Sequence, residues 1–96
     1  MPWIFEIKDK SGRKIHLSNE IWHHIVTEHS ILANRLEDIK DTLINPSTIL
    51  PSKYDEKVRF YYKFYKKMSK YLLVSVKYLN GEGFIITAFY TQKLEK

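Results

Sequence analysis

The chain has 96 residues, which allow a single hydrophobic core, so we expect residues 1–96 to form one domain. It has no cysteine, which excludes disulfide bonds, thiolate nucleophiles and cysteine-based zinc sites, and fits the cytoplasm as its location. The net charge of +5 belongs to the second half: residues 1–50 hold 6 Lys/Arg and 7 Asp/Glu, whereas residues 51–96 hold 10 and 4. No basic segment leads into an apolar run, and no apolar run approaches the roughly 18 residues that span a bilayer, so we expect neither a signal peptide nor a membrane span.

The first part of the chain predicts a hairpin followed by a helix. Two short apolar stretches, residues 4–8 and 14–17, are separated by turn-forming residues and predict a small β-hairpin. Ser18 and Asn19 are both suitable helix N-caps, and apolar side chains then recur at helical spacing. We therefore expect a first helix over about residues 19–29.

A second helix is predicted to begin at Ser30, which can cap it. It ends at Asn45-Pro46, because the residue before a proline is disfavoured in the α conformation. One side of this helix forms an apolar stripe of Leu32, Leu36, Ile39 and Leu43. From Thr48 onward the apolar residues change from a helical to a strand period.

Three strands are predicted in the second half, at about residues 58–65, 71–79 and 84–91. The last two are joined by Asn80-Gly81-Glu82-Gly83, a strong hairpin turn. The expected fold is therefore α+β, with an N-terminal hairpin and two helices packed on a curved antiparallel sheet of three to four strands.

Pairing across this hairpin predicts which side chains share a sheet face. In a regular register, odd positions of one strand face even positions of the other. Ser75 and Lys77 then share a face with Phe84 and Ile86. The polar residues Thr87, Thr91 and Lys93 lie on the opposite face, unless a β-bulge intervenes.

Three of the four histidines lie in the first predicted helix, namely His23, His24 and His29. Their separations of one, five and six residues do not match the i,i+4 spacing of two metal ligands on a helix, so we expect no metal site. His24 lies beside Glu28, which can set its tautomer, and it is our first choice as general acid or base. His29 lies on the apolar stripe and is also explained as a hydrogen-bonded residue at the rim of the core.

Cations alternate with aromatic residues between Lys57 and Tyr71, a pattern that suits nucleic-acid binding. An equally good interpretation places the aromatics in the core and the lysines on a solvated sheet edge. Arg59 and Tyr61 fall on one strand face and are the favoured binding candidates. Lys77 ends an apolar strand, so it either reaches the rim or faces an anionic group. Thr87 interrupts an apolar run, but threonine is also an ordinary strand residue.

Several motifs together resemble the phage-borne branch of the barnase, EndoU, colicin and RelE nuclease superfamily. The resemblance covers about residues 20–93. The matching residues are Trp22-x-His24-Ile25, His29, Thr42-Leu43-Ile44-Asn45-Pro46 with Ile49, Tyr61-Tyr62, Tyr71-Leu72-Leu73-Val74-x-Val76-Lys77 and Gly83-Phe84-Ile85-Ile86-Thr87-Ala88-Phe89-x-Thr91-x-Lys93. Two positions depart from the pattern: Ser30 stands where a proline is expected, and Phe89 stands where a tyrosine is common, which removes a hydroxyl.

The resemblance implies a helix pair followed by a four-stranded antiparallel sheet, and RNA cleavage without metal or cofactor by attack of a ribose 2′-OH on the adjacent phosphate. It also implies a toxin or phage effector that acts on RNA such as tRNA or ribosome-bound mRNA and is neutralised by a cognate antitoxin. Together with the patterns above it gives the catalytic candidates His24, His29, Lys77 and Thr87, and the substrate-binding candidates Arg59, Tyr61, Tyr62, Lys63, Thr91 and Lys93.

Two functions other than catalysis fit the same residues. A non-catalytic RNA-binding module would use the basic second half without any indispensable histidine. A protein-interaction domain would use the same basic surface to accept an acidic peptide.

Overall fold

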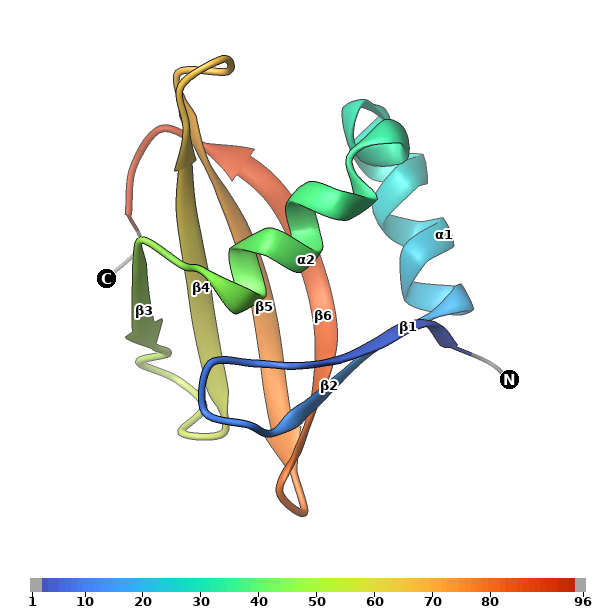
Figure 1. The fold of residues 1–96 in the computed structure, drawn as a ribbon, viewed down its shortest axis with the longest axis vertical. Helices are drawn as coiled ribbons and strands as arrows, with labels where there is room; N and C mark the ends of the chain where they lie inside the picture. Colours follow the sequence, from blue (N-terminus) through green and yellow to red (C-terminus); the bar gives the residue numbers. More distant parts are fainter. Residues whose placement is uncertain (1–2, 95–96) are drawn as a thin grey trace.

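The computed structural model describes residues 3–94, in which one mixed six-stranded sheet packs with two α-helices (Figure 1). The strand order is β1-β2-β6-β5-β4-β3. The strands are β1 (Trp3–Lys8), β2 (Lys14–Ser18), β3 (Thr48–Pro51), β4 (Val58–Tyr65), β5 (Lys70–Leu79) and β6 (Glu82–Thr91). This confirms the α+β class and the two helices, while the expectation of a three- to four-stranded antiparallel sheet is wrong.

The two further pairings explain the extra strands. The short edge strand β3 pairs with β4, and the N-terminal hairpin joins the sheet through a parallel contact of β2 with β6. That contact covers only two pairs, Ile15 with Gly83 and His16 with Phe84. A two-stranded hairpin is marginal alone, so docking on a larger sheet is what stabilises it. The sequence pattern identifies a hairpin but does not reveal the strand edge on which it docks.

The first helix, α1, spans Asn19–Glu28, and the Ser18 hydroxyl caps it by accepting a hydrogen bond from the Ile21 amide at 3.1 Å. The predicted second helix is two elements, a 3-10 helix η1 (Ser30–Asn34) and the α-helix α2 (Leu36–Ile44). They are separated at Arg35, whose φ of −122° and ψ of 26° leave the helical region. The predicted apolar stripe nevertheless faces the core, since Leu32, Ile39 and Leu43 are fully buried and Leu36 packs against them.

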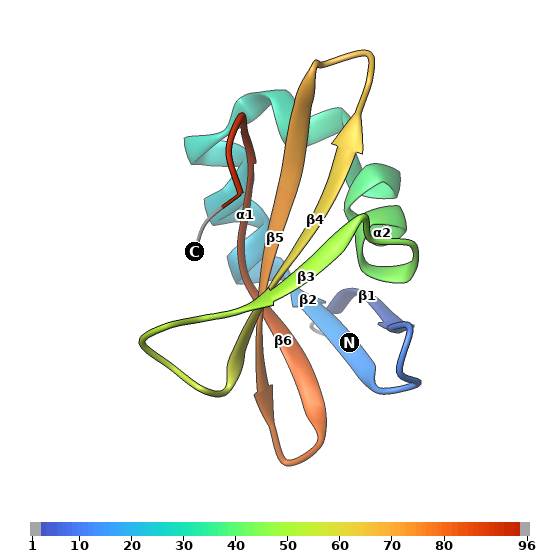
Figure 2. The ribbon, with the colours of Figure 1, turned by 90° about the vertical axis from the view of Figure 1, so that its left-hand side faces the viewer.

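Helix α2 covers one face of β4 and β5, which we call the helix face (Figure 2). The core lies between them and includes Tyr61, Leu72, Val74, Val76, Ile85 and Ala88 of the sheet. We call the other side the open face. Its residues follow from the register and are Val58, Phe60, Tyr62 and Phe64 of β4, Tyr71, Leu73, Ser75 and Lys77 of β5, and Phe84, Thr87, Phe89 and Thr91 of β6. Figure 2 shows the loop between β3 and β4 projecting on the side opposite α2, which is the side of the open face.

A β-bulge in β6 determines which of its residues reach the open face. Ser75 pairs with Thr87, whereas the next residue, Val76, pairs with Ile85, so Ile86 is the extra residue. The hairpin loop is the two residues Asn80 and Gly81, both in the left-handed region. The bulge corrects the prediction from regular pairing, because it moves Thr87 and Thr91 onto the same face as Ser75 and Lys77.

Helix α1 lies alongside β6 where β2 has left it (Figure 1). The pairing of β2 with β6 ends at Phe84. Beyond Phe84 the outer edge of β6 faces α1. The helix ends near the sheet, and its C-cap residue is His29. None of the helices between residues 3 and 94 is long and apolar enough to cross a bilayer.

A buried carboxylate fastens the N-terminal hairpin to the helix face. One oxygen of Asp9 accepts hydrogen bonds from the Tyr61 hydroxyl at 3.0 Å and the Tyr78 hydroxyl at 2.8 Å, and the two hydroxyls also contact each other. The other oxygen accepts from the Ser11 amide and hydroxyl and from the Arg13 amide. Burial raises the pKa of Asp9, but these hydrogen bonds outweigh burial and hold the pKa below its ordinary value. Burial raises the pKa of both tyrosines.

Candidate functional site

The open face carries a row of small hydroxyl side chains at its centre. Ser75 of β5 lies directly opposite Thr87 of β6, with Phe60 of β4 on the other side of Ser75. Ser75 is only 5% exposed although it lies on the face away from α2. Hydroxyls at this position can donate hydrogen bonds to an anionic ligand. The centre of the open face is therefore polar and flanked by aromatic rings.

A cation marks one end of this row. Lys77 lies two residues beyond Ser75 on the same face, and its ammonium is 3.1 Å from a carboxylate oxygen of Asp55. Asp55 belongs to the loop between β3 and β4. A hydrogen bond from the Lys57 amide and the ammonium of Lys77 lower the pKa of Asp55, so this carboxylate is charged at neutral pH. Lys77 thus reaches the rim of the sheet, faces an anionic group there, and is partly exposed.

A histidine at the C-terminal end of α1 contacts a residue of the open face. The ring of His29 lies 5.6 Å from the ring of Phe89, measured between centroids, and Phe89 is two residues along β6 from Thr87. His24 is placed differently: it is 60% exposed on α1, and its Nε2 lies 3.4 Å from the carboxylate of Glu28. The structure therefore brings His29, and not His24, into contact with the open face.

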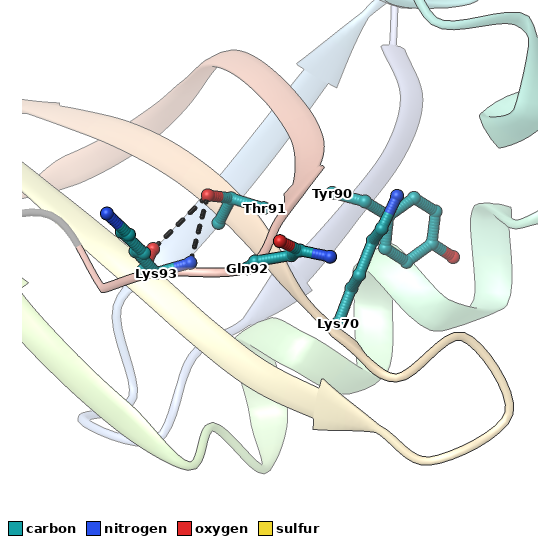
Figure 3. Close-up of a pocket in the computed structure, with 5 residues that line it drawn as sticks. All are labelled: Lys70, Tyr90, Thr91, Gln92 and Lys93. Atoms are coloured by element: carbon teal, nitrogen blue, oxygen red, sulfur yellow. Dashed lines mark hydrogen bonds between the residues drawn. The ribbon is translucent and has the colours of Figure 1, made fainter.

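A hollow of about 510 Å³ lies where β6 ends, and it is lined by Lys70, Tyr90, Thr91, Gln92 and Lys93 (Figure 3). Lys70 and Tyr90 belong to the helix face and Thr91 to the open face, so the hollow lies at the end of the sheet between the two faces. The Thr91 hydroxyl donates to the Lys93 carbonyl at 3.2 Å and accepts from the Lys93 amide at 3.4 Å, which fixes the turn after β6. Within residues 3–94, neither Lys70 nor Lys93 forms an ion pair. The ammonium groups of these two lysines, beside the side-chain amide of Gln92, suit the binding of a phosphate or another anion.

Tyr90 forms the apolar wall of this hollow. Figure 3 shows its ring beside the side chain of Lys70, with its hydroxyl pointing away from Thr91. That hydroxyl is buried and makes no hydrogen bond with the described residues, and burial raises its pKa. Tyr90 lies on the helix face and packs against the core.

The β4 candidates are divided between the two faces of the sheet. Arg59, Tyr61 and Lys63 lie on the helix face, as alternation predicts. The Arg59 guanidinium donates to the Glu56 carbonyl at 2.7 Å, and the Lys63 ammonium is 3.4 Å from Asp41 and donates to the Asn45 carbonyl. These three side chains are engaged with other parts of the fold.

The two adjacent tyrosines of β4 are both core residues. Tyr61 is 3% exposed, with its hydroxyl on Asp9, and Tyr62 is fully buried on the open face, where Tyr71 packs edge-on against it. Neither ring is accessible for stacking in this conformation. The strand thus buries aromatic rings on both faces, whereas simple alternation of side chains is typical of a strand with one buried face.

Sequence reasoning missed three residues at this site. Ser75 had a usable signal, because it is the one small polar residue in an otherwise apolar strand. Lys70 belongs to the stretch of cations and aromatic residues between Lys57 and Tyr71, but the pattern did not distinguish it from the other lysines there. Asp55 had no signal, because it reaches Lys77 only through the geometry of the loop. No group of three or more His, Asp or Glu side chains in the described part of the chain is arranged to hold a metal ion.

Comparison with known families assigns the chain. No curated protein and no solved structure matches it. A family model described as phage-Barnase-EndoU-ColicinE5/D-RelE like nuclease2 matches residues 5–96, which includes both helices and all strands from β2 to β6. This confirms the resemblance found in the sequence motifs, and the chain belongs to this phage nuclease family.

Proposed function

We propose that the protein is a metal-independent endoribonuclease that binds RNA along the open face. The observation that carries the proposal is the bulge at Ile86, which aligns Thr87, Phe89 and Thr91 with Ser75 and Lys77. Without it, the polar residues of β5 and β6 would lie on opposite sides of the sheet. Membership of a nuclease family supports catalysis as the purpose of this alignment.

The reaction requires a base for the ribose 2′-OH, cationic donors for the phosphate and an acid for the leaving 5′-oxygen. The 2′-oxygen bonds to phosphorus as its proton passes to the base, and the bond to the 5′-oxygen breaks as that oxygen receives a proton. The products are a 2′,3′-cyclic phosphate and a 5′-hydroxyl. We assign one of the two proton transfers to His29, phosphate binding to Lys77, and substrate positioning to Thr87. His24, the first choice from the sequence, is replaced because its ring nitrogen contacts Glu28 away from this row.

The charges at the two ends of the open face support a chain-like anionic substrate. Lys77 lies at one end, and Lys93 follows Thr91 at the other end, where both line the hollow. Along β5 the distance from Tyr71 to Lys77 is about 20 Å, since a strand rises about 3.3 Å per residue. A short single-stranded segment of RNA can contact both ends at once. The substrate class we propose is cellular RNA such as tRNA or ribosome-bound mRNA, cut by a toxin or phage effector that a cognate antitoxin restrains.

The test is incubation of the purified protein with total RNA in EDTA, followed by gel analysis of the fragments and their ends. His29→Ala and Lys77→Ala should abolish cleavage, while His24→Ala, on the same helix, serves as the matched control and should cleave normally. Circular dichroism checks that each variant is folded. Cleavage by all three variants would contradict the assigned site. If the protein binds RNA but cleaves none, even when tRNA and ribosomes are also present, the non-catalytic RNA-binding function is favoured.

A further inference from the structure

The loop between β3 and β4, residues 52–57, is held by its own hydrogen bonds. The Ser52 hydroxyl accepts from the Tyr54 amide at 3.1 Å and from the Asp55 amide at 3.3 Å. The Ser52 amide donates to the Val58 carbonyl at 3.1 Å, and the Val58 amide donates to the Asp55 carbonyl at 3.0 Å. The Asp55 side chain also accepts from the Lys57 amide at 2.9 Å. These bonds fix the loop backbone from one strand to the next.

This ordered loop presents an aromatic ring to solvent. Tyr54 is 94% exposed, more than any other large hydrophobic residue in the described part of the chain. A ring in that position contributes almost nothing to the core, because it buries almost no apolar area. Figure 2 shows that the loop projects on the side of the sheet away from α2, the side on which the open face lies.

The loop that carries Tyr54 holds two cations and two anions, and it connects directly to the proposed phosphate site. Lys53 and Lys57 belong to the same loop, and both are exposed. Asp55, the next residue after Tyr54, touches the ammonium of Lys77 at 3.1 Å. This ion pair joins the loop that carries Tyr54 to the strand that carries the proposed phosphate ligand. Cations placed beside an exposed ring are the arrangement by which proteins bind single-stranded nucleic acids.

We propose that Tyr54 is a stacking platform for an unpaired nucleobase of the RNA whose neighbouring phosphate contacts Lys77. The inference rests on the proposed function and adds the substrate class, which is single-stranded RNA or an unpaired loop. Bases in a duplex are stacked and paired, so their faces are closed to the ring. Stacking is tolerant of sequence because every base has an aromatic face, so Tyr54 selects strandedness rather than a particular base.

The test measures binding and not cleavage. The probe is a short, fluorescein-labelled, single-stranded RNA with 2′-O-methyl groups, which cannot be cut by 2′-OH attack. A duplex of the same sequence is the second probe. Tyr54→Ala should weaken binding of the single strand by about tenfold, within the range that stacking on one base provides. Tyr54→Phe and Tyr54→Trp should bind like the wild type, because both keep an aromatic ring.

Two controls separate stacking from a general effect. Ile31→Ala removes another exposed apolar side chain, from η1, and should leave binding unchanged. Tyr54→Ala should also leave the affinity for the duplex unchanged, since no base face is available there. The wild type should bind a single-stranded probe with an abasic position about as weakly as Tyr54→Ala binds the intact probe. On the abasic probe, Tyr54→Ala should weaken binding little further.

The outcomes distinguish this inference from the proposed function. One outcome is that the wild type binds the single strand and that Lys77→Ala weakens this binding while Tyr54→Ala does not. In that case the stacking role is wrong and the open-face site stands. Equal losses on the single strand and the duplex would also overturn the stacking role. If the wild type binds neither probe, both proposals fail.

Discussion

Thr87 lies directly opposite Ser75 on the open face, and the extra residue Ile86 is what places it there. A one-residue insertion in a strand exchanges the two faces for all residues beyond it, because side chains alternate along a strand. Ala88 and Tyr90 are turned to the helix face by the same bulge and pack in the core. The single β-bulge at Ile86 therefore places apolar residues in the core and polar residues in the candidate site.

The hydroxyl of Thr87 should matter for cleavage and not for folding. Thr87→Val keeps the branched shape and the strand preference, so the free energy of unfolding should change by less than about 1 kcal/mol. Loss of one hydrogen bond to the reacting phosphate should lower the RNA cleavage rate by about tenfold. The control is Thr27→Val on the exposed side of α1. A Thr87→Val protein that cleaves at the wild-type rate would exclude a role for this hydroxyl.

Asp55 should compete with RNA for Lys77. Asp55→Asn removes the negative charge but keeps an oxygen that can accept from the Lys57 amide. Binding of single-stranded RNA should tighten several-fold, because one fewer anion repels the phosphate backbone. Glu56→Gln is the matched control, since it removes the same charge from the same loop without touching Lys77. Fluorescence anisotropy at fixed salt compares the two, and equal gains would show that only net charge matters.

Gly83 should be required where the hairpin joins the sheet. A Cβ added there would lie 2.8 Å from Val76 Cγ1, 3.0 Å from Tyr78 Cε1 and 3.1 Å from Ile15 Cγ1. Gly83→Ala should therefore lower the free energy of unfolding by about 1 to 3 kcal/mol, as overpacking of a buried site does. Urea unfolding measures this directly. An unchanged midpoint would mean that β2 moves away from β6 at no cost.

Asp9 should make stability depend on pH in the acid range. Its folded pKa lies below the unfolded value, so its contribution is present above the unfolded pKa and is lost as pH falls through the folded pKa. At neutral pH, Asp9→Ala leaves the Tyr61 and Tyr78 hydroxyls without their acceptor and should cost about 2 to 4 kcal/mol. Unfolding of the wild type and the variant should be compared from neutral pH to below the unfolded pKa. A difference in stability that stays constant over that range would contradict the prediction.

Much of the candidate site could be predicted one residue at a time, but not as a group. Lys77, Thr87 and Thr91 were identified from their place in strands and from the family motifs, and all three lie on the open face. The sequence ranks His24 above His29, whereas the structure places His29 against Phe89, because helical spacing does not say which histidine is near the sheet. Tyr61 is a binding candidate from strand alternation, and the sequence does not reveal that its hydroxyl is bound to Asp9, because Asp9 is 52 residues away.

The sequence by itself determined the hairpin, the helices, the last three strands and the family, because these depend on local periodicity, capping residues and motif order. Only the tertiary structure decided how the hairpin joins β6, where α1 ends relative to Phe89, and which face carries the polar row. Those features depend on contacts between distant segments and on a single bulged residue. Side-chain alternation in a strand has a period of two, so one residue that the pattern does not reveal reverses every face beyond it.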